Sequence, residues 1–157
     1  MSDGATEIAL SGNGSYQAAR AEIRCPSPAR FNIAEICCAD WAAREPNRTA
    51  LIFADGAGRP VEVSYGALDP MVSRCANALK NLGVKRGDRV AIHLGQRLET
   101  VVAHLAAYRL AAVTVPLAAV FGSDAIAYRM EHADAAVIIT SAEGAERLPP
   151  LSATVVT

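Results

Sequence analysis

The sequence predicts an α/β fold with a doubly wound, mostly parallel sheet, helices on both faces and an antiparallel hairpin at the edge. Two observations carry this prediction. From residue 65 onward, hydrophobic patterns of helical and strand period alternate along the chain, and a hairpin pattern precedes them at residues 50–64. Strands separated by helices of this length pair in parallel through right-handed crossovers, which cover both faces of the sheet. The 157 residues suffice for a hydrophobic core without disulfides or metals.

The first 30 residues differ in character from the rest. They contain "SGNGS" and "CPSPAR" and show no sustained periodicity, so we expect an N-terminal arm at residues 1–30 and one partial domain at residues 31–157. Asp3 and Glu7 stand where a secretory signal carries basic residues. The longest apolar run, Leu110 to Phe121, is shorter than the roughly 20 residues of a membrane-spanning helix. We therefore expect a cytoplasmic protein without a membrane partner.

The domain is expected to open with a short helix and the hairpin. The segment "FNIAEICCADWAAREP" favours an amphipathic helix that stops before Pro46. Its apolar face is predicted to consist of Ile33, Ile36, Cys37 and Trp41. "ALIFADGAGRPVEVS" then contains two β-rich runs joined by a turn. Its "GAG" is not a dinucleotide-binding loop, because Gly56 and Gly58 lie between two strands and lack the third glycine of that fingerprint.

Three main helices are expected in the alternating region. The apolar stripe of the first is Met71, Val72, Cys75, Leu79 and Leu82, and that of the second is Leu98, Val101, Val102, Leu105 and Ala106. We expect Asp69 to cap the first helix and Pro70 to be its first residue, because a proline inside a helix costs about 3 kcal/mol. The third helix, "SDAIAYRMEHA", is expected to have Ser123 or Asp124 as its cap. The predicted strands are "RVAIHL", "AVTVP", "AVIIT" and "ATVVT".

The stretch "NLGVKRGDRVAI" is interpreted as framework rather than as a binding motif. Gly83 follows the last apolar position of a helix, where a left-handed cap is expected, and Val84 then folds back onto the helix end. Residues 85–88 form a turn in which Gly87 takes positive φ. The 15 basic and 16 acidic residues give a formal net charge of -1, so the sequence lacks the excess positive charge that nucleic-acid binding requires.

Metal and nucleophile signatures are lacking in the sequence. The cysteines, Cys25, Cys37, Cys38 and Cys75, show no Cys-x-x-Cys spacing, so we expect reduced, mostly buried thiols and no metal site. No Gly-x-Ser-x-Gly elbow occurs, and no catalytic residue is assigned. His93 stands near the carboxyl end of a strand, where a buried or rim position is favoured over a ligand role.

The order of these elements resembles a known family. "LGVKRGDRVAI", "GQRLETVVAHLAAYRLAAVTVPL" and "VFGSDAIAYRM" together resemble the beginning of the adenylate-forming, AMP-binding acyl-CoA synthetases, in the branch for short- and medium-chain or aromatic acids. The resemblance covers residues 31–157 and implies the N-terminal subdomain of the adenylate-forming synthetase fold. In that family a carboxylate and ATP form an acyl-adenylate, and coenzyme A then displaces AMP to give a thioester.

The resemblance also implies which parts are missing from this chain. The family's phosphate loop, its Tyr-Gly-x-Thr-Glu segment and its catalytic lysine would all follow Thr157. ATP, Mg²⁺ and coenzyme A are therefore cofactors of the full-length family, and none is expected to bind tightly to this chain. The implied partners are the remainder of the synthetase and a small carboxylic acid, and uncovered β edges favour self-association. The chain is expected to be inactive by itself.

Four residues are candidates for coenzyme A binding. Phe121, Gly122 and Ser123 match the family's Phe-Gly segment, and a loop that opens a helix suits a phosphate because free N–H groups face the anion. The alternative is that Phe121 fills the core and Gly122 permits the turn. The fourth residue, Arg147, is displaced by about one position from the family's arginine. Ala111 and Ala112 replace a family glycine, and their methyl groups are expected to strain local packing.

Two other functional classes remain open on the sequence alone. The chain could be a non-catalytic α/β binding or interaction module derived from such an enzyme. It could also be an unrelated flavodoxin-like binder of a small ligand.

Overall fold

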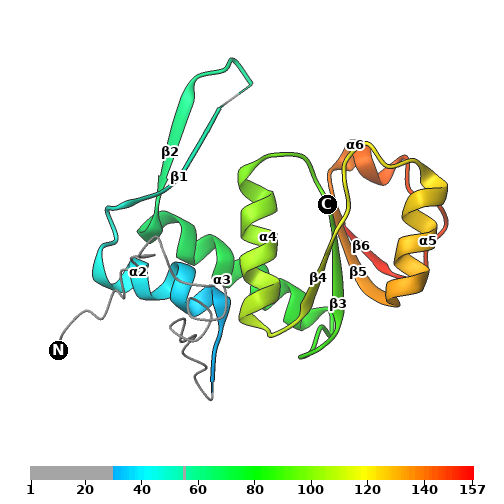
Figure 1. The fold of residues 1–157 in the computed structure, drawn as a ribbon, viewed down its shortest axis with the longest axis horizontal. Coiled ribbons are helices and arrows are strands. Elements are labelled where there is room, and N and C mark those ends of the chain that lie inside the picture. Colours follow the sequence, from blue (N-terminus) through cyan, green and yellow to red (C-terminus); the bar gives the residue numbers. More distant parts are fainter. Residues whose placement is uncertain (1–29, 55) are drawn as a thin grey trace, which may run out of the picture. The chain divides into compact units, whose positions relative to one another are not determined.

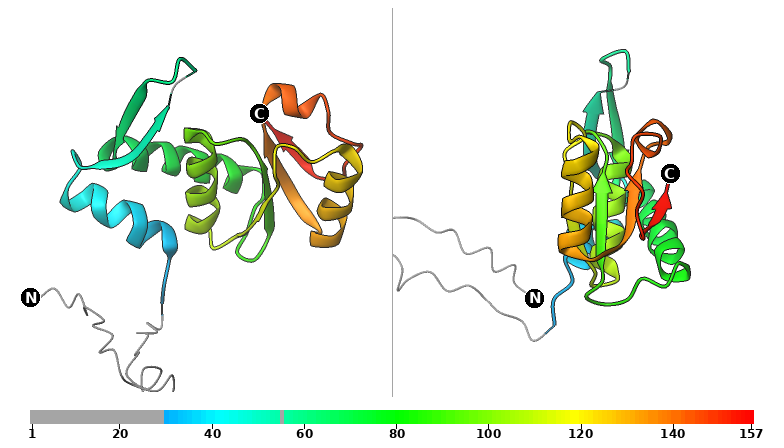
Figure 2. Two further views of the ribbon diagram at one scale, coloured as in Figure 1. Left: turned by 45° about the horizontal axis from the view of Figure 1, so that its top comes forward. Right: turned by 90° about the vertical axis from the view of Figure 1, so that its right-hand side faces the viewer.

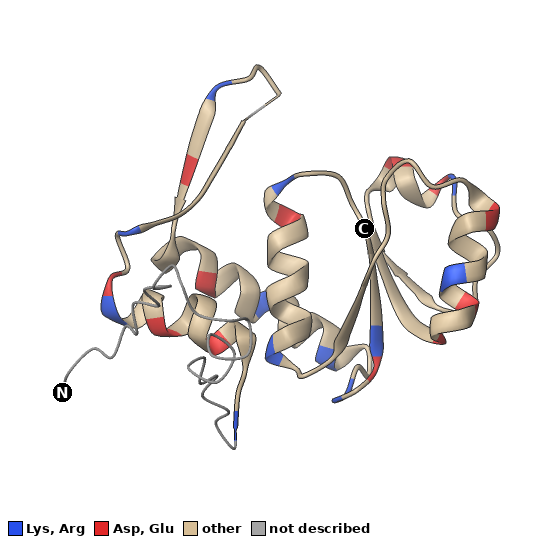
Figure 3. Ribbon diagram, viewed as in Figure 1, with Lys and Arg blue, Asp and Glu red and all other residues tan. Residues whose placement is uncertain are grey.

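The computed structural model describes residues 30–54 and 56–157. The chain divides into two units, Met1–Phe31 and Asn32–Thr157. The arm predicted for residues 1–30 lies outside the described residues, apart from Arg30. Within the described ranges, no helix is long and apolar enough to cross a membrane. Acidic and basic residues are interspersed along the helices and strands (Figure 3).

A parallel four-stranded sheet forms the centre of the second unit (Figure 1). Its strands are β3 (Arg89–His93), β4 (Val113–Pro116), β5 (Ala135–Thr140) and β6 (Thr154–Val156), in the order β4-β3-β5-β6. This confirms the predicted α/β class. The chain moves from β3 outward to β4 and returns to the other side of β3, so β3 and β5 form the topological switch point of the sheet.

Helices cover both faces of this sheet, as predicted (Figures 1 and 2). α3 (Tyr65–Asn81) and α4 (Leu98–Arg109) share one core cluster with Val90 and Ile92 of β3. α5 (Ser123–Ala133) packs on the opposite face against Ala91. Each fully buried aliphatic side chain in these clusters contributes about 1.5–3 kcal/mol relative to an exposed one. The alternation along β3 therefore divides the core into two layers.

The hairpin is antiparallel, as predicted, but it does not extend the parallel sheet. β1 (Thr49–Ala54) and β2 (Pro60–Ser64) form a separate two-stranded sheet. β2 runs without a loop into α3, which places the hairpin beside that helix rather than at a sheet edge. Leu51 and Phe53 pack against the α3 and α4 core cluster, and a two-stranded hairpin needs such packing to be stable.

The first helix buries a different face from the predicted one. It consists of a π-helical turn, η1 (Glu35–Ala39), followed by α2 (Asp40–Arg44). Ala34 and Cys38 are fully buried, whereas Ile33 and Ile36 are more than 40% exposed and Cys37 is also exposed. The wider π turn shifts the phase of the side chains relative to the 3.6-residue period assumed from the sequence.

α3 begins earlier than predicted. Its cap is Ser64, whose hydroxyl accepts a hydrogen bond from the Ala67 amide, and Pro70 lies inside the helix. The amides of Tyr65 and Gly66 donate to the carbonyls of Arg48 and Pro46 at 3.0 and 2.8 Å. The helix start is held by the chain segment that precedes the hairpin, and these contacts offset the free-energy cost of a proline inside the helix. The prediction that Asp69 caps this helix is therefore wrong.

The predicted framework turn between α3 and β3 is confirmed. Gly83 has a φ of 91°, and the amides of Gly83 and Val84 donate to the carbonyls of Lys80 and Leu79, which is a Schellman cap. Gly87 has a φ of 86°. The Asp88 carboxylate accepts a hydrogen bond from the Lys85 amide at 2.8 Å, which closes the turn before β3.

The expected strain at Ala111 and Ala112 has a different origin from the predicted one. Ala111 is exposed but adopts a φ of 54°, a left-handed conformation that costs an L-residue about 1–2 kcal/mol. Ala112 is buried and follows directly. The backbone, rather than the packing, therefore favours glycine at this position.

Candidate functional site

A pocket of about 680 Å³ lies at the carboxyl ends of the parallel strands. Its wall comes from three segments: residues 93–97 at the end of β3, residues 119–123 between β4 and the start of α5, and residues 141–147 after β5, which include the short helix α6 (Ala142–Ala145). The first and third of these segments lie at the ends of the two strands of the topological switch point, which is where open α/β sheets bind ligands. All four predicted site residues, Phe121, Gly122, Ser123 and Arg147, line this pocket.

The N-terminus of α5 forms one side of the pocket. Gly122 is the cap residue and has no side chain to accept from the helix amides, so the predicted cap at Ser123 or Asp124 is wrong. The first hydrogen bond within the helix runs from the Ile126 amide to the Gly122 carbonyl at 3.1 Å. The amides of residues 123–125 therefore have no acceptor in the helix, and the positive end of its dipole favours an anion.

Phe121 serves both the core and the pocket. Its ring packs partly against the cluster formed by α5, and it also lines the pocket. The Arg129 guanidinium carbon lies 4.3 Å from the ring centroid, and this guanidinium donates to the Ala125 carbonyl at 2.9 Å. The ring is thus held in place between the core and a cation from α5.

Two arginines of the pocket wall are each paired with a glutamate. Arg97 donates to the Glu99 carboxylate at 2.8 Å, and this hydrogen bond lowers the pKa of Glu99. Arg147 pairs with Glu143 one helical turn earlier, and both side chains are more than 70% exposed. Such exposed pairs contribute about 0–1 kcal/mol, so they can separate when a stronger anion approaches.

The floor of the pocket includes a buried histidine that sequence reasoning did not assign to a site. His93 is 7% exposed, and its Nδ1 lies 3.2 Å from Oγ1 of Thr140 on the neighbouring strand. Gly144 packs so closely on Thr140 that a β-carbon at residue 144 would lie 2.2 Å from the Thr140 hydroxyl oxygen. The prediction of a buried or rim histidine is confirmed, but its contact with Thr140 depends on strand register.

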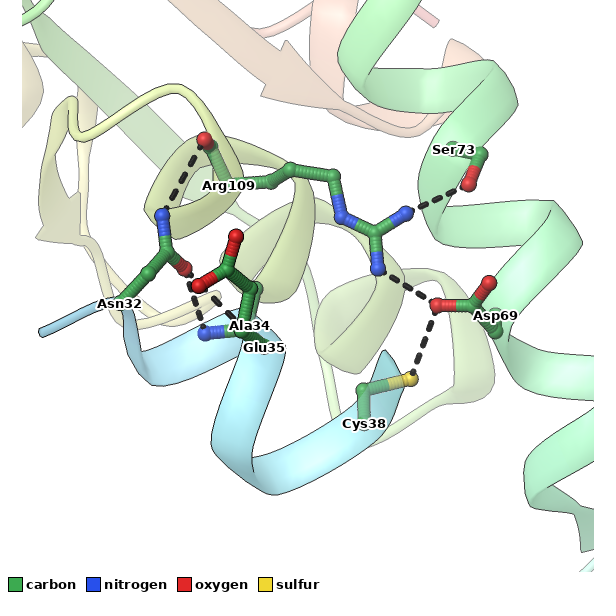
Figure 4. A network of polar contacts seen from close by, with 7 residues as sticks. All are labelled: Asn32, Ala34, Glu35, Cys38, Asp69, Ser73 and Arg109. Carbon is green, nitrogen blue, oxygen red and sulfur yellow. Dashed lines mark hydrogen bonds and ion pairs between the residues drawn. The ribbon is translucent and has the colours of Figure 1, made fainter. Parts of the chain in front are cut away.

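A separate polar network ties the first helix to α3 and α4 (Figure 4). Arg109 donates to the Asp69 carboxylate and the Ser73 hydroxyl, both at 2.5 Å. Burial, followed by the nearby Asp69 carboxylate, raises the pKa of the Cys38 thiol to about 11. Asn32 donates to the carbonyls at the end of α4 and accepts from the Ala34 amide at 2.9 Å. These contacts are structural, and they keep Cys38 as an unreactive thiol.

The described residues hold no cluster of three or more metal-ligating side chains. Cys37, Cys38 and Cys75 are free, while Cys25 lies outside the described residues. Cys37 is exposed, so the prediction of mostly buried thiols fails at that position.

The chain matches known proteins over most of its length. The family model of AMP-binding enzymes covers residues 38–156. The acetyl-coenzyme A synthetase of Coprinopsis cinerea is 39% identical over 115 residues, which are 73% of this chain and 17% of that protein. The enzyme of the same name from Nitrosomonas europaea is 36% identical over 127 residues, or 80% of this chain and 19% of that protein.

Solved structures show the same arrangement of elements. The Brucella canis acyl-CoA synthetase superposes with a TM-score of 0.76 at 25% identity, covering 90% of this chain and 28% of that one. The N-terminal subdomain of Klebsiella oxytoca NpsA, in complex with anthranilyl-AMSN, gives a TM-score of 0.69 at 25% identity, and the match covers 80% of this chain and 31% of that one. The chain spans 16–20% of the length of the curated relatives. It belongs to the family of AMP-binding enzymes and corresponds to the N-terminal region of acyl-CoA synthetases.

Proposed function

We propose that the pocket at the start of α5 holds the phosphate-bearing part of coenzyme A in an acyl-CoA synthetase of which this chain is the N-terminal region. The observation that carries the proposal is that Phe121, Gly122, Ser123 and Arg147 line a single pocket at the switch point of the sheet. Its volume of about 680 Å³ falls in the usual range for small-molecule sites.

The chemistry of the wall suits such a ligand. The free amides of the first turn of α5 and the guanidinium groups of Arg97 and Arg147 favour phosphate oxygens. Leu94, Val120 and Phe121 offer apolar surface to the less polar part of the coenzyme. The pocket therefore combines anion recognition with hydrophobic contact on one edge of the sheet.

The position of Gly122 supports a ligand role more than a purely structural one. Its φ is -75°, which any residue adopts, and no atom lies within 4 Å of the β-carbon that another residue would add. The turn itself therefore does not require glycine. A β-carbon at this position would instead stand at the mouth of the α5 N-terminus, where a phosphate has to approach the backbone closely.

We infer further that this chain performs no adenylation by itself. That reaction joins a small carboxylic acid to ATP, with Mg²⁺ neutralising the phosphates, and it needs donors fixed around the transferred group. The 157 residues contain no phosphate loop with Pro-Lys-Gly and no segment like Tyr-Gly-x-Thr-Glu. The remainder of a synthetase is the partner that would supply those groups.

Calorimetric titration of coenzyme A into the 157-residue chain tests the pocket. Gly122→Ala is expected to weaken binding while lowering the free energy of unfolding by less than about 1 kcal/mol, the cost of alanine at a helix cap. Arg147→Gln should also weaken binding, whereas Arg86→Gln makes the same charge change outside the pocket and should not. Equal affinities for all four proteins would refute the assignment.

ATP–pyrophosphate exchange tests the second part of the proposal. The chain should show no exchange above a blank with short, medium-chain or aromatic acids. Exchange that depends on both the acid and Mg²⁺ would show that the chain is catalytically complete.

A further inference from the structure

One buried polar atom lies beneath the wall of this pocket without a partner. Among the residues that the structure describes, Nε2 of His93 is the buried side-chain nitrogen or oxygen that makes no hydrogen bond. His93 is 93% buried and belongs to the pocket wall. Leaving such a group unpaired costs about 1–3 kcal/mol, so it is normally explained by an unseen partner.

The other ring nitrogen of His93 is already engaged. Its Nδ1 lies 3.2 Å from Oγ1 of Thr140, which fixes the ring relative to β5. If the Thr140 hydroxyl donates to Nδ1, Nε2 carries the proton of the neutral imidazole, and in the imidazolium form Nε2 carries a proton as well. Nε2 is then a hydrogen-bond donor, which is the group that an anionic oxygen requires.

The neighbouring polar groups of the wall do not satisfy this donor. The Ser141 hydroxyl accepts from the Gly144 amide at 3.0 Å and caps α6 (Ala142–Ala145). The Glu143 carboxylate is paired with Arg147 and is exposed. The amides at the start of α5 are further donors, so the described residues leave Nε2 of His93 without an acceptor.

We propose that His93 is a ligand-contacting residue of the pocket, and that its Nε2–H donates a hydrogen bond to a phosphate oxygen seated between the β3 end and the α5 N-terminus. The inference rests on the proposed coenzyme A function of the pocket and adds the group that recognises the phosphate from the floor. Nε2 is covered in this conformation, so a side chain of the wall moves when the ligand makes this contact.

Nitrogen NMR of the histidine side chains tests the contact directly. The chain labelled with ¹⁵N-histidine contains His93, His104 and His132, and the last two lie outside the pocket and serve as internal controls. Coenzyme A should shift the Nε2 resonance of His93 and leave those of His104 and His132 unchanged. Inorganic phosphate should shift the same resonance at higher concentration, and pantetheine, which lacks phosphate, should not.

A pair of variants separates ligand contact from structure. His93→Phe with Thr140→Val replaces both partners of the buried hydrogen bond with apolar groups, a change that is close to neutral for stability. This double variant should bind coenzyme A about 10- to 100-fold more weakly, the effect of one hydrogen bond to a charged group. Thr140→Val alone keeps Nε2 but no longer fixes the ring, so its affinity should lie between those of the parent chain and the double variant.

The outcomes distinguish this inference from the function on which it rests. Binding of coenzyme A with an unmoved His93 resonance, or with full affinity in the double variant, overturns the inference and leaves the proposed function standing. A phosphate-dependent shift at His93 without coenzyme A binding supports the inference and overturns the proposed function. No binding of coenzyme A and no response to phosphate overturns both.

Discussion

Replacing Ala111 with glycine should stabilise this protein, although alanine is usually the better residue near a helix. Ala111 ends α4 in the same Schellman geometry that Gly83 gives α3. The amides of Ala111 and Ala112 donate to the carbonyls of Tyr108 and Ala107 at 2.9 and 3.0 Å. The φ of 54° at Ala111 therefore repeats the 91° at Gly83 with a residue that disfavours positive φ.

The magnitude follows from two opposing terms. Relief of the left-handed conformation contributes about 1–2 kcal/mol, and the greater freedom of glycine in the unfolded chain opposes it by about 0.5–1 kcal/mol. Ala111 is exposed, so the loss of its methyl group removes little buried surface. We expect Ala111→Gly to raise the free energy of unfolding by roughly 0.5–1 kcal/mol.

Urea unfolding followed by circular dichroism measures this change against two controls. Gly83→Ala should destabilise by about 1 kcal/mol through its backbone alone, because no atom lies within 4 Å of the added β-carbon. Ala78→Gly, at an exposed position inside α3, should destabilise by about 0.8–1 kcal/mol. If Ala111→Gly destabilises the protein as much as Ala78→Gly does, the assignment of backbone strain is wrong.

Three further predictions concern the polar network, the pocket and the sheet edges. The pKa of Cys38 is raised to about 11, so the folded state holds this proton more tightly than the unfolded state does. The free energy of unfolding should therefore be retained below about pH 9 and decline toward pH 11. Unfolding measured across that pH range should show a smaller decline for Cys38→Ala than for the parent chain. Glu143→Gln frees Arg147 and should strengthen coenzyme A binding about 1.5- to 5-fold in calorimetry, whereas Glu131→Gln, outside this pocket, should leave it unchanged. The edge strands β4 and β6 expose Val113 and Val155 by 50% and 44%, so sedimentation should show association that increases with concentration, and a monomer at all concentrations would contradict it.

The sequence predicted those features that depend on residues close together in the chain. The cap at Gly83 and the turn at Gly87 follow from glycine after an apolar stripe, and both have the expected positive φ. The strands were recognisable because each is a short apolar run between helical patterns. The loop of Phe121, Gly122 and Ser123 was found through a family resemblance, and its position at a helix start supplied a physical reason.

The failures arise where distant residues decide the local structure. The start of α3 is set by carbonyls of Pro46 and Arg48, which precede the hairpin, and no periodicity within the helix shows this. The π turn changes which side of the first helix is buried. As a result Cys38 is buried, and Ile33, which was predicted to be on the buried face, is exposed. The contact of His93 with Thr140 joins residues 47 positions apart and depends on the register between β3 and β5.

The balance of charges around the pocket leads us to expect that neutral donors contribute strongly to the binding of its proposed ligand. Arg97 is compensated by Glu99, and Arg147 is compensated by Glu143, so each cation presents a reduced field to an approaching phosphate. The amides at the start of α5 have no such compensation from their cap residue, since Gly122 has no side chain. The α5 amides belong to a helix that packs on the parallel sheet, and His93 lies in β3 of that sheet. A fixed donor loses less conformational freedom on binding than a flexible arginine does. Recognition of the phosphate should therefore depend more on these fixed donors than on the arginines, and the affinity for coenzyme A should fall less steeply with salt than a site built from unpaired arginines would.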